Sequence, residues 1–134
     1  MPKALDAFLD SRAASLTGRI LLTLPFWSSG LAKLADWSAT LGEMSHFGLS
    51  PPAAYGAATV ACQLIGSALI LWGPYAWLGA GALGVFTALT IPIAHNFWAL
   101  SGQAAQLEMY TAVEHVALIG GLILAAALRR RETR

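Results

Sequence analysis

The sequence contains a run of sixty-four residues, Met44 to Leu107, without a single Asp, Glu, Lys or Arg. A soluble domain of this size is about a quarter charged and about half apolar. This chain is 11% charged and 57% hydrophobic. So few charged side chains cannot cover a water-facing surface, and we therefore expect an integral membrane protein.

The run is too long for one membrane crossing, because about 20 apolar residues already span a hydrocarbon core of about 30 Å. Gly73-Pro74 is the expected turn within it, since glycine tolerates the conformations that end a helix and proline cannot continue one. Apolar segments of spanning length also flank the run on both sides. The sequence thus predicts four transmembrane helices, at about residues 18–35, 52–71, 76–98 and 110–128.

The predicted fold is all-α, an integral membrane four-helix bundle that forms one domain over residues 1–134, with short interfacial helices. Apolar residues at helical spacing between Leu5 and Leu16 predict one such helix before the first span. Trp37, Leu41, Met44 and Phe47 predict a second one between the first two spans, capped by Asp36 or Ser38.

Two rows of residues predict which helix faces point into the bundle. Helices approach one another in membranes through small side chains and interhelical hydrogen bonds. The second span carries a polar row of Tyr55, Thr59, Gln63 and Ser67. The third span carries a row of small residues, Ala76, Ala80, Gly84 and Ala88. We expect both rows to face inward, and Gln63 to need a hydrogen-bond partner or a ligand because it lies near the middle of its span.

The cations predict the orientation of the bundle. Seven of the eight Lys and Arg residues lie at the two ends of the chain, and the exception is Lys33. Short segments rich in Lys and Arg tend to stay in the cytoplasm. Four spans also place both termini on one side. We therefore expect cytoplasmic N- and C-termini, with the loops after the first and third spans on the outer side.

Four ionisable residues, Lys33, His95, Glu114 and His115, are expected at a similar depth, about one turn below the outer surface. An unpaired charge within the bilayer is costly. We therefore expect Lys33 to pair with Glu114, and an imidazole of His95 or His115 to exchange protons. The alternative is an ion pair at the outer interface with no further role.

Other candidate ligand-binding residues are Gln63, Trp27 and Trp98. The two tryptophans lie near the outer level, where an aromatic belt is the alternative interpretation. Haem ligation by His95 and His115 is a weaker possibility, because no notch of small residues accompanies the two histidines. The spacing of His and Cys residues is not that of a metal site. Cys62 stands alone, and no basic surface points to nucleic acid.

Several segments resemble the DoxX family of small bacterial membrane proteins with four spans. The resemblance rests on the stretches Gly18 to Leu22, Ser29 to Lys33, Gly48 to Pro51, His95 to Trp98 and Ala117 to Leu122. It implies a four-helix bundle in the bacterial inner membrane. The family is named after a subunit of a terminal quinol oxidase and thiosulfate:quinone oxidoreductase system. Many members look to have a carboxylate at the position of Gln63 and a Lys-Asn pair at Glu114-His115.

Two functions from different classes fit these observations. The first is a redox-linked subunit that binds a quinone at the outer cluster and works with a partner oxidoreductase, since the chain has no flavin, nicotinamide or iron–sulfur motif of its own. The second is a non-catalytic scaffold or accessory subunit of a larger complex. Both imply a bilayer and a protein partner or homo-oligomer, and a small-molecule permease is less favoured because four spans leave little room for a pathway.

Overall fold

The computed structural model of the chain describes residues 2–132, with side chains as far as Arg129. Its elements are α1 (Lys3–Leu9), α2 (Arg12–Ala35), α3 (Trp37–His46), α4 (Pro52–Trp72), α5 (Ala76–Ala94), the 3₁₀ turn η1 (Phe97–Ala99) and α6 (Gly102–Glu132). Residues 2–132 contain no strand, which confirms the all-α prediction.

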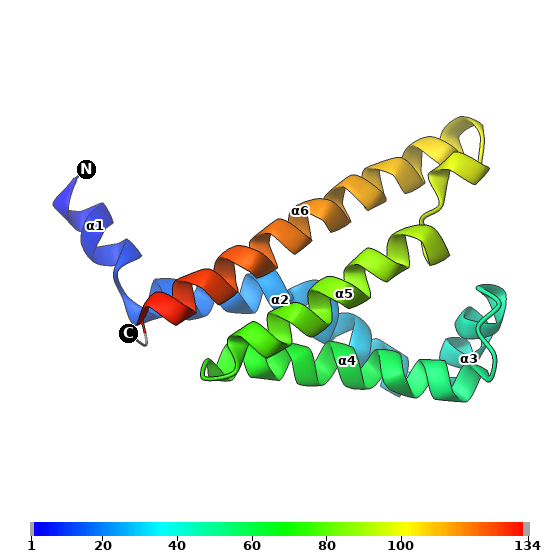
Figure 1. Cartoon of the computed structure of the whole chain (residues 1–134), viewed down its shortest axis with the longest axis horizontal. Helices are drawn as coiled ribbons and strands as arrows, with labels where there is room; N and C mark the ends of the chain where they lie inside the picture. Colours follow the sequence, from blue (N-terminus) through cyan, green and yellow to red (C-terminus); the bar gives the residue numbers. More distant parts are fainter. Residues whose placement is uncertain (1, 133–134) are drawn as a thin grey trace.

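The long helices form a bundle that is tight at one end and open at the other (Figure 1). Helix α5 packs against both α4 and α6, and α2 packs against α4. The helices converge at the Gly73 end, where Gly73-Pro74 joins α4 to α5. They spread apart toward the α3 end, where α3 and η1 lie, so that α4 and α6 diverge there.

The turn at Gly73 is confirmed. Gly73 has a φ of 104°, a backbone conformation that residues with a Cβ rarely adopt. An added Cβ would also lie 2.5 Å from Nη2 of Arg129 on α6. The side chain of Arg129 therefore lies against the turn, where a larger residue than glycine would displace it.

Several predicted helix ends were wrong. The helix expected between Leu5 and Leu16 is two helices, because the chain breaks at Asp10 and Ser11 accepts a capping hydrogen bond from the Ala14 amide. The α-helix of the third span ends at Ala94, four residues before the predicted end at residue 98. Helix α6 begins at Gly102, eight residues before the predicted start.

The amphipathic helix between the first two spans is confirmed as α3. Asp36 caps it by accepting a hydrogen bond from the Ala39 amide at 2.9 Å. The Thr40 hydroxyl donates to the backbone oxygen of Lys33 at 3.0 Å, which ties α3 to the end of α2. Thr40 and Met44 are its buried residues, so α3 folds back over the α3 end of the bundle.

The backbones of α4 and α5 approach closely at Gly66 and Gly79. A Cβ added to Gly79 would lie 2.5 Å from the backbone oxygen of Gly66, so only glycine fits there. The predicted row of small residues on α5 is buried at Ala76 and Ala80. It leaves the interface toward the α3 end, where a Cβ on Gly84 would meet no atom within 4 Å.

The polar row on α4 does face inward. Gln63 and Ser67 are buried, Thr59 is half-buried, and Tyr55 lies at the edge with its side chain exposed. The Ser67 hydroxyl donates to the backbone oxygen of Gln63 at 2.6 Å, which satisfies it within its own helix. Below this row, a hydrophobic core joins all four long helices through Phe26, Ile70, Ala80, Leu83 and Leu122.

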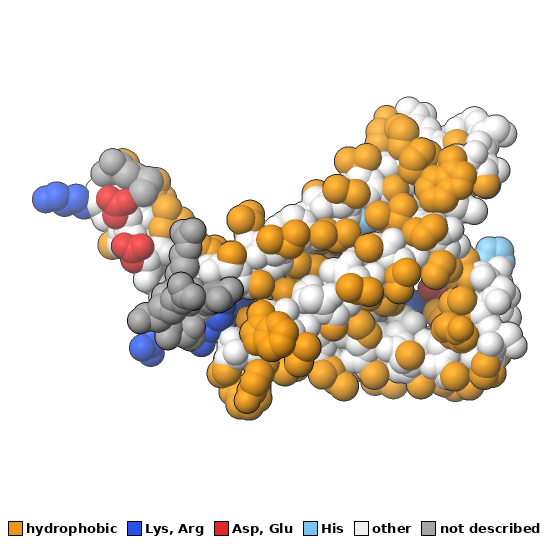
Figure 2. All heavy atoms as spheres, in the orientation of Figure 1, with side chains coloured by type: hydrophobic (Ala, Val, Ile, Leu, Met, Phe, Trp, Pro, Cys, Tyr) orange, Lys and Arg blue, Asp and Glu red, His pale blue; other side chains and the backbone are white. Residues whose placement is uncertain are grey.

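Three helical segments of the described chain are long and apolar enough to cross a membrane, rather than the four expected. They are Pro52–Trp72, Ala76–Ala99 and Gly102–Arg129, with mean hydropathies of 1.6, 1.6 and 1.9. Helix α2 has the length but not the apolar composition, because its sequence includes Arg19 and Lys33. Hydrophobic side chains cover much of the surface in Figure 2, as expected of a protein surrounded by lipid.

Candidate functional site: a cleft at the α3 end

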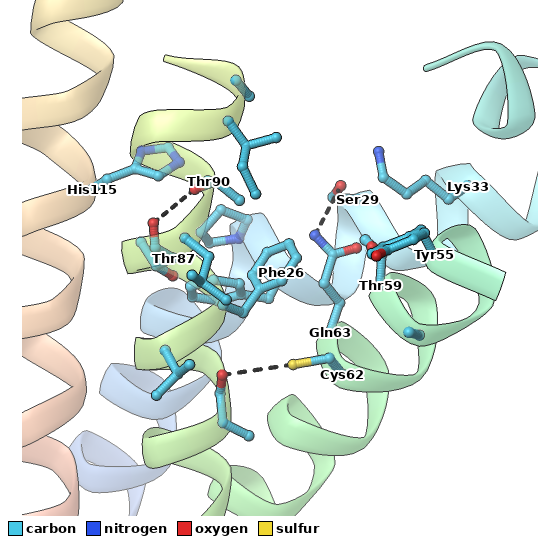
Figure 3. Close-up of a pocket in the computed structure, with 18 of the residues that line it drawn as sticks. Phe26, Ser29, Lys33, Tyr55, Thr59, Cys62, Gln63, Thr87, Thr90 and His115 are labelled. Carbon is cyan, nitrogen blue, oxygen red and sulfur yellow. Dashed lines mark hydrogen bonds between the residues drawn. The ribbon is translucent and has the colours of Figure 1, made fainter. Parts of the chain in front are cut away.

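The spread of the helices creates a cleft of about 920 Å³. Its walls come from α2, α3, α4, α5 and α6. The exposed side chains of Tyr55, Val85 and Leu89 are among the lining residues, so the cleft reaches the molecular surface beside α4 and α5. Phe26 lies at its base, next to the hydrophobic core (Figure 3).

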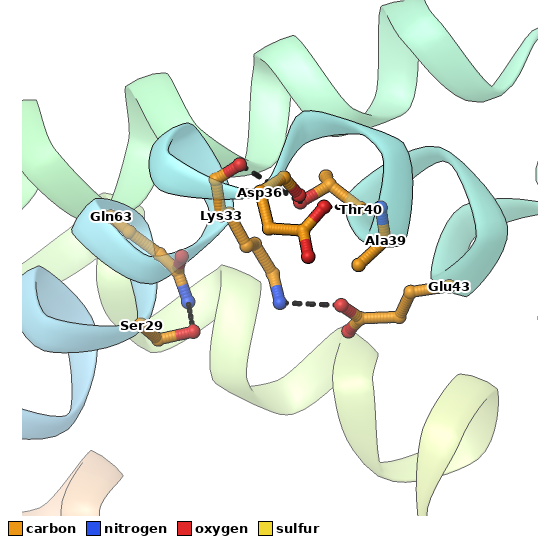
Figure 4. Close-up of polar contacts among 7 residues, drawn as sticks. All are labelled: Ser29, Lys33, Asp36, Ala39, Thr40, Glu43 and Gln63. Carbon is orange, nitrogen blue, oxygen red and sulfur yellow. Dashed lines mark hydrogen bonds and ion pairs between the residues drawn. The ribbon is translucent and has the colours of Figure 1, made fainter.

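Lys33 projects into this cleft from α2 and pairs with α3. Its Nζ lies 2.6 Å from Oε2 of Glu43, and 15% of the Lys33 side chain is exposed (Figure 4). The predicted pairing of Lys33 with Glu114 was therefore wrong. Lys33 and Glu114 are matched in depth along the chain, but α3 folds back and brings Glu43 over the end of α2.

Gln63 lies in the wall of the cleft, and only 5% of the residue is exposed. Its Nε2 donates to Oγ of Ser29 on α2 at 3.3 Å (Figure 4). Its Oε1 is buried and has no hydrogen-bond partner among the described residues. A buried acceptor without a donor costs about 1–3 kcal/mol. The expectation that the Gln63 amide needs a partner is therefore met for its nitrogen, which bonds to Ser29. Its oxygen has no partner among the described residues.

The two predicted histidines meet at the edge of the cleft. The ring centroids of His95 and His115 lie 4.7 Å apart in an edge-to-face arrangement. Two rings in contact leave no space for a macrocycle between them, so this geometry does not fit haem ligation by the pair. Nδ1 of His115 is buried and finds no partner at hydrogen-bonding distance and angle among the described residues.

Glu108 belongs to this group, although the sequence analysis did not single it out. Its Oε2 lies 2.6 Å from Nδ1 of His95, and 36% of its side chain is exposed. The signal was present in the sequence: Glu108 is the carboxylate that ends the charge-free run, thirteen residues after His95. Only the early start of α6 makes it a helical residue that faces α5.

Glu114 lies elsewhere. It is exposed, does not line the cleft, and makes no hydrogen bond or salt bridge with any described residue. Neighbouring residues of an α-helix point about 100° apart, so His115 reaches the cleft while Glu114 does not. The structure thus brings together Lys33, Gln63, His95 and His115 and leaves Glu114 outside.

The two predicted tryptophans, Trp27 and Trp98, do not line the cleft. Trp27 is half-buried on α2, and Trp98 in η1 is 60% exposed. The position of Trp98 agrees with the aromatic-belt interpretation. Among the described residues, no group of three or more His, Cys, Asp and Glu side chains has the arrangement of a metal site.

The site therefore combines donors, acceptors and a large apolar wall. The Lys33 ammonium carries three N–H donors and the Gln63 carbonyl is an acceptor, while an imidazole can be either. The group formed by His95, His115 and Glu108 joins the cleft to a carboxylate that is open to solvent. Such an arrangement can hold a neutral polar ring and exchange protons with it.

Comparison with protein families gives one result. The DoxX family model matches residues 14–96, which is more than half of the chain and includes Lys33, Gln63 and His95. Comparisons with curated proteins and with solved structures gave no match. The match ends before α6, so Glu108 and His115 lie outside it. The extent of the match from α2 to the end of α5 shows that the chain belongs to the DoxX family.

Proposed function

We propose that the cleft binds a quinone, and that the chain is a membrane subunit that works with an oxidoreductase carried by another protein. The observation that carries this proposal is the distribution of polar groups. Lys33, Glu43, His95 and His115 lie toward the α3 end of the cleft, and the remaining wall is largely apolar. A ligand with a polar ring and a long apolar tail matches that division.

The length of the cleft also suits such a ligand. Its lining residues on α5 extend from Trp77 to His95. At about 1.5 Å per residue this is about 27 Å along the helix, close to the thickness of the hydrocarbon core. The cleft therefore has room for a tail that follows α5, and its exposed edge lets the tail enter from the lipid.

The polar atoms of the wall fit the ring. A bound quinone supplies two-electron, two-proton chemistry, and the residues of the chain bind and orient it and move the protons. Oε1 of Gln63 on α4 is buried without a hydrogen-bond partner among the described residues, and Nδ1 of His115 on α6 is buried with no well-aligned partner there. The hydroxyl of the reduced, quinol form of the ring can donate to the Gln63 oxygen, and this bond would remove the cost of leaving that oxygen unsatisfied.

The exchange of protons with water is assigned to the histidine pair. His95 contacts His115 on one side and Glu108 on the other. Because the Glu108 carboxylate is partly exposed, protons released in the cleft have a route out of the bundle. Lys33 holds the opposite wall, where its bond to Glu43 keeps α3 over the cleft.

The proposal includes a position in the bacterial inner membrane with α2 as a fourth crossing and both termini in the cytoplasm. Two of the three cations of α2 have partners on neighbouring helices. Arg19 donates to the backbone oxygens of Ile70 and Leu71, and Lys33 is paired with Glu43. Arg19 and Arg129 both lie at the Gly73 end, which the excess of positive charge assigns to the cytoplasmic side.

The test is the quinone content of the purified protein. We expect the full-length chain, extracted in a mild detergent, to carry about one quinone per molecule, measured by solvent extraction and mass spectrometry. Gln63→Leu should lower this content several-fold, because it removes the amide that faces the cleft. Ser67→Ala is the matched control: Ser67 is also buried on α4, but its hydroxyl bonds to the Gln63 backbone oxygen and does not line the cleft.

Full quinone content in Gln63→Leu would place the ligand elsewhere. A wild-type protein that keeps its native lipids but carries no quinone, and copurifies with a stoichiometric protein, would replace the redox function with the scaffold function.

A further inference from the structure

The exposed face of α6 presents polar side chains where lipid is expected. Three helices are apolar enough to cross a membrane, and α6 is the least buried of them. Only 11% of its 18-residue apolar segment is buried inside the protein. Figure 1 shows it at the edge of the bundle. Along its exposed side lie Tyr110, Glu114, Ala117, Gly120 and Leu124, which we call the α6 face.

The carboxylate of Glu114 is the residue of the α6 face that is energetically least favourable in lipid. Glu114 lies fifteen residues before Arg129 on α6, which is about 22 Å along the helix. That distance is shorter than the hydrocarbon thickness of about 30 Å, so Glu114 lies within the bilayer when Arg129 is at its surface. A carboxylate in that setting needs a donor. No described residue of the chain donates a hydrogen bond to it.

A matching donor lies one turn away on the same face. Tyr110 is 52% exposed, and its Oη accepts a hydrogen bond from Nε2 of Gln106 at 3.0 Å. A tyrosine hydroxyl is both donor and acceptor. Its acceptor role is filled, and no described residue accepts its proton. The α6 face therefore carries one free donor, the Tyr110 hydroxyl, and one free acceptor, the Glu114 carboxylate, one helical turn apart.

A face with both groups is complementary to itself. In a two-fold dimer, the same patch of each copy meets its counterpart, so a donor on one copy can meet the acceptor on the other twice. Small residues let two helices approach closely in lipid. Ala117 and Gly120 are the small residues of the α6 face, and they follow Tyr110 and Glu114 along the helix. A Cβ on Gly120 would meet no atom of its own chain within 4 Å.

We propose that the α6 face is the interface of a homodimer, in which Tyr110 of each copy donates to Glu114 of the other. The occupant is a second copy of this chain, because the face offers the donor and the acceptor that each needs. The cleft opens beside α4 and α5, so the dimer leaves it accessible to lipid. The inference does not depend on the identity of the ligand in the cleft.

Disulfide crosslinking of the full-length protein in native membranes tests the interface. The single native cysteine is first changed, Cys62→Ser, and one reporter is then added. We expect Ala117→Cys on the α6 face to give a covalent species of twice the 14.1 kDa chain on oxidation. The matched control is Ile65→Cys, which is 59% exposed on α4 and should stay monomeric.

The hydrogen bonds are tested in the Ala117→Cys background. Tyr110→Phe removes only the hydroxyl, and Glu114→Leu removes the charge without touching the core, so both variants should fold. Each should lower the crosslinking yield several-fold. Monomer only, equal crosslinking at Ile65→Cys, an adduct of any other mass, or a yield that neither variant changes would each overturn the dimer.

Discussion

Lys33 shows how a single charged side chain is accommodated at the α3 end of the bundle. Its ammonium lies 2.6 Å from the Glu43 carboxylate, and 15% of its side chain is exposed against 41% for Glu43. Because Glu43 is open to water, the pair is worth less than a fully buried ion pair. We assign it about 1 kcal/mol of coupling free energy.

A double-mutant cycle measures this coupling. Lys33→Met and Glu43→Gln should each lower thermal stability in detergent, and the double variant should lose about 1 kcal/mol less than the sum of the two losses. The control is the cycle of Lys33→Met with Glu114→Gln, which should be additive because these residues do not meet. Coupling in the control cycle and additivity in the first would restore the pairing expected from the sequence.

For single residues, the sequence predicted which ones lie at the same end of the bundle better than which ones meet. Depth along a span follows from counting residues, and it placed Lys33, His95 and His115 at the same end. Partner choice depends on how α3 folds back and where α6 begins, and those features brought in Glu43 and Glu108. Neither was predicted, because the pattern of charges does not encode the path of a loop.

Among the helices, α2 is the one whose role is described least well by its amino-acid composition. It has 24 residues, enough to cross a membrane, yet its mean hydropathy falls short because it includes cations. Arg19 bonds to the last carbonyls of α4, and Lys33 to α3. Because Arg19 and Lys33 have hydrogen-bond partners on neighbouring helices, α2 is more compatible with lipid than its sequence alone indicates.

We therefore expect α2 to cross the bilayer, and cysteine labelling tests it. In a Cys62→Ser background, Ser45→Cys on α3 should react with a membrane-impermeant maleimide on intact spheroplasts. Ala13→Cys, at the start of α2, should react only after lysis. Both positions are exposed in the structure, so access differs only by compartment. Labelling of both from the same side would show that α2 does not cross.

The elements were predicted in number and order but not at their ends. Hydrophobic periodicity and the turn residues at Gly73-Pro74 identify each helix. The ends depend on local contacts: His95 leaves the helix where Glu108 holds its ring, and α2 begins where Ser11 supplies a cap. Such contacts depend on how the chain folds, so the pattern of residues along the sequence does not reveal them.

The whole molecule is a bundle closed at one end and open at the other. Close packing at the Gly73 end comes from Gly66, Gly79 and the core around Leu83. Toward the α3 end the row of small residues on α5 no longer contacts a neighbouring helix, and the cleft lies there. The sequence indicated an inward polar row and a cluster of ionisable groups. It did not indicate that the helices spread apart, because spreading depends on all the interfaces together.

Photolabelling with a quinone analogue tests most directly whether this cleft is the ligand site. The full-length protein in lipid nanodiscs is irradiated with an azido-quinone, digested and analysed by mass spectrometry. We predict adducts on the cleft-lining peptides of α4 around Gln63 and of α5 between Val85 and Ile93, and their loss when excess unlabelled quinone competes. Adducts confined to the exposed side of α6, or adducts that competition leaves unchanged, would contradict the quinone site.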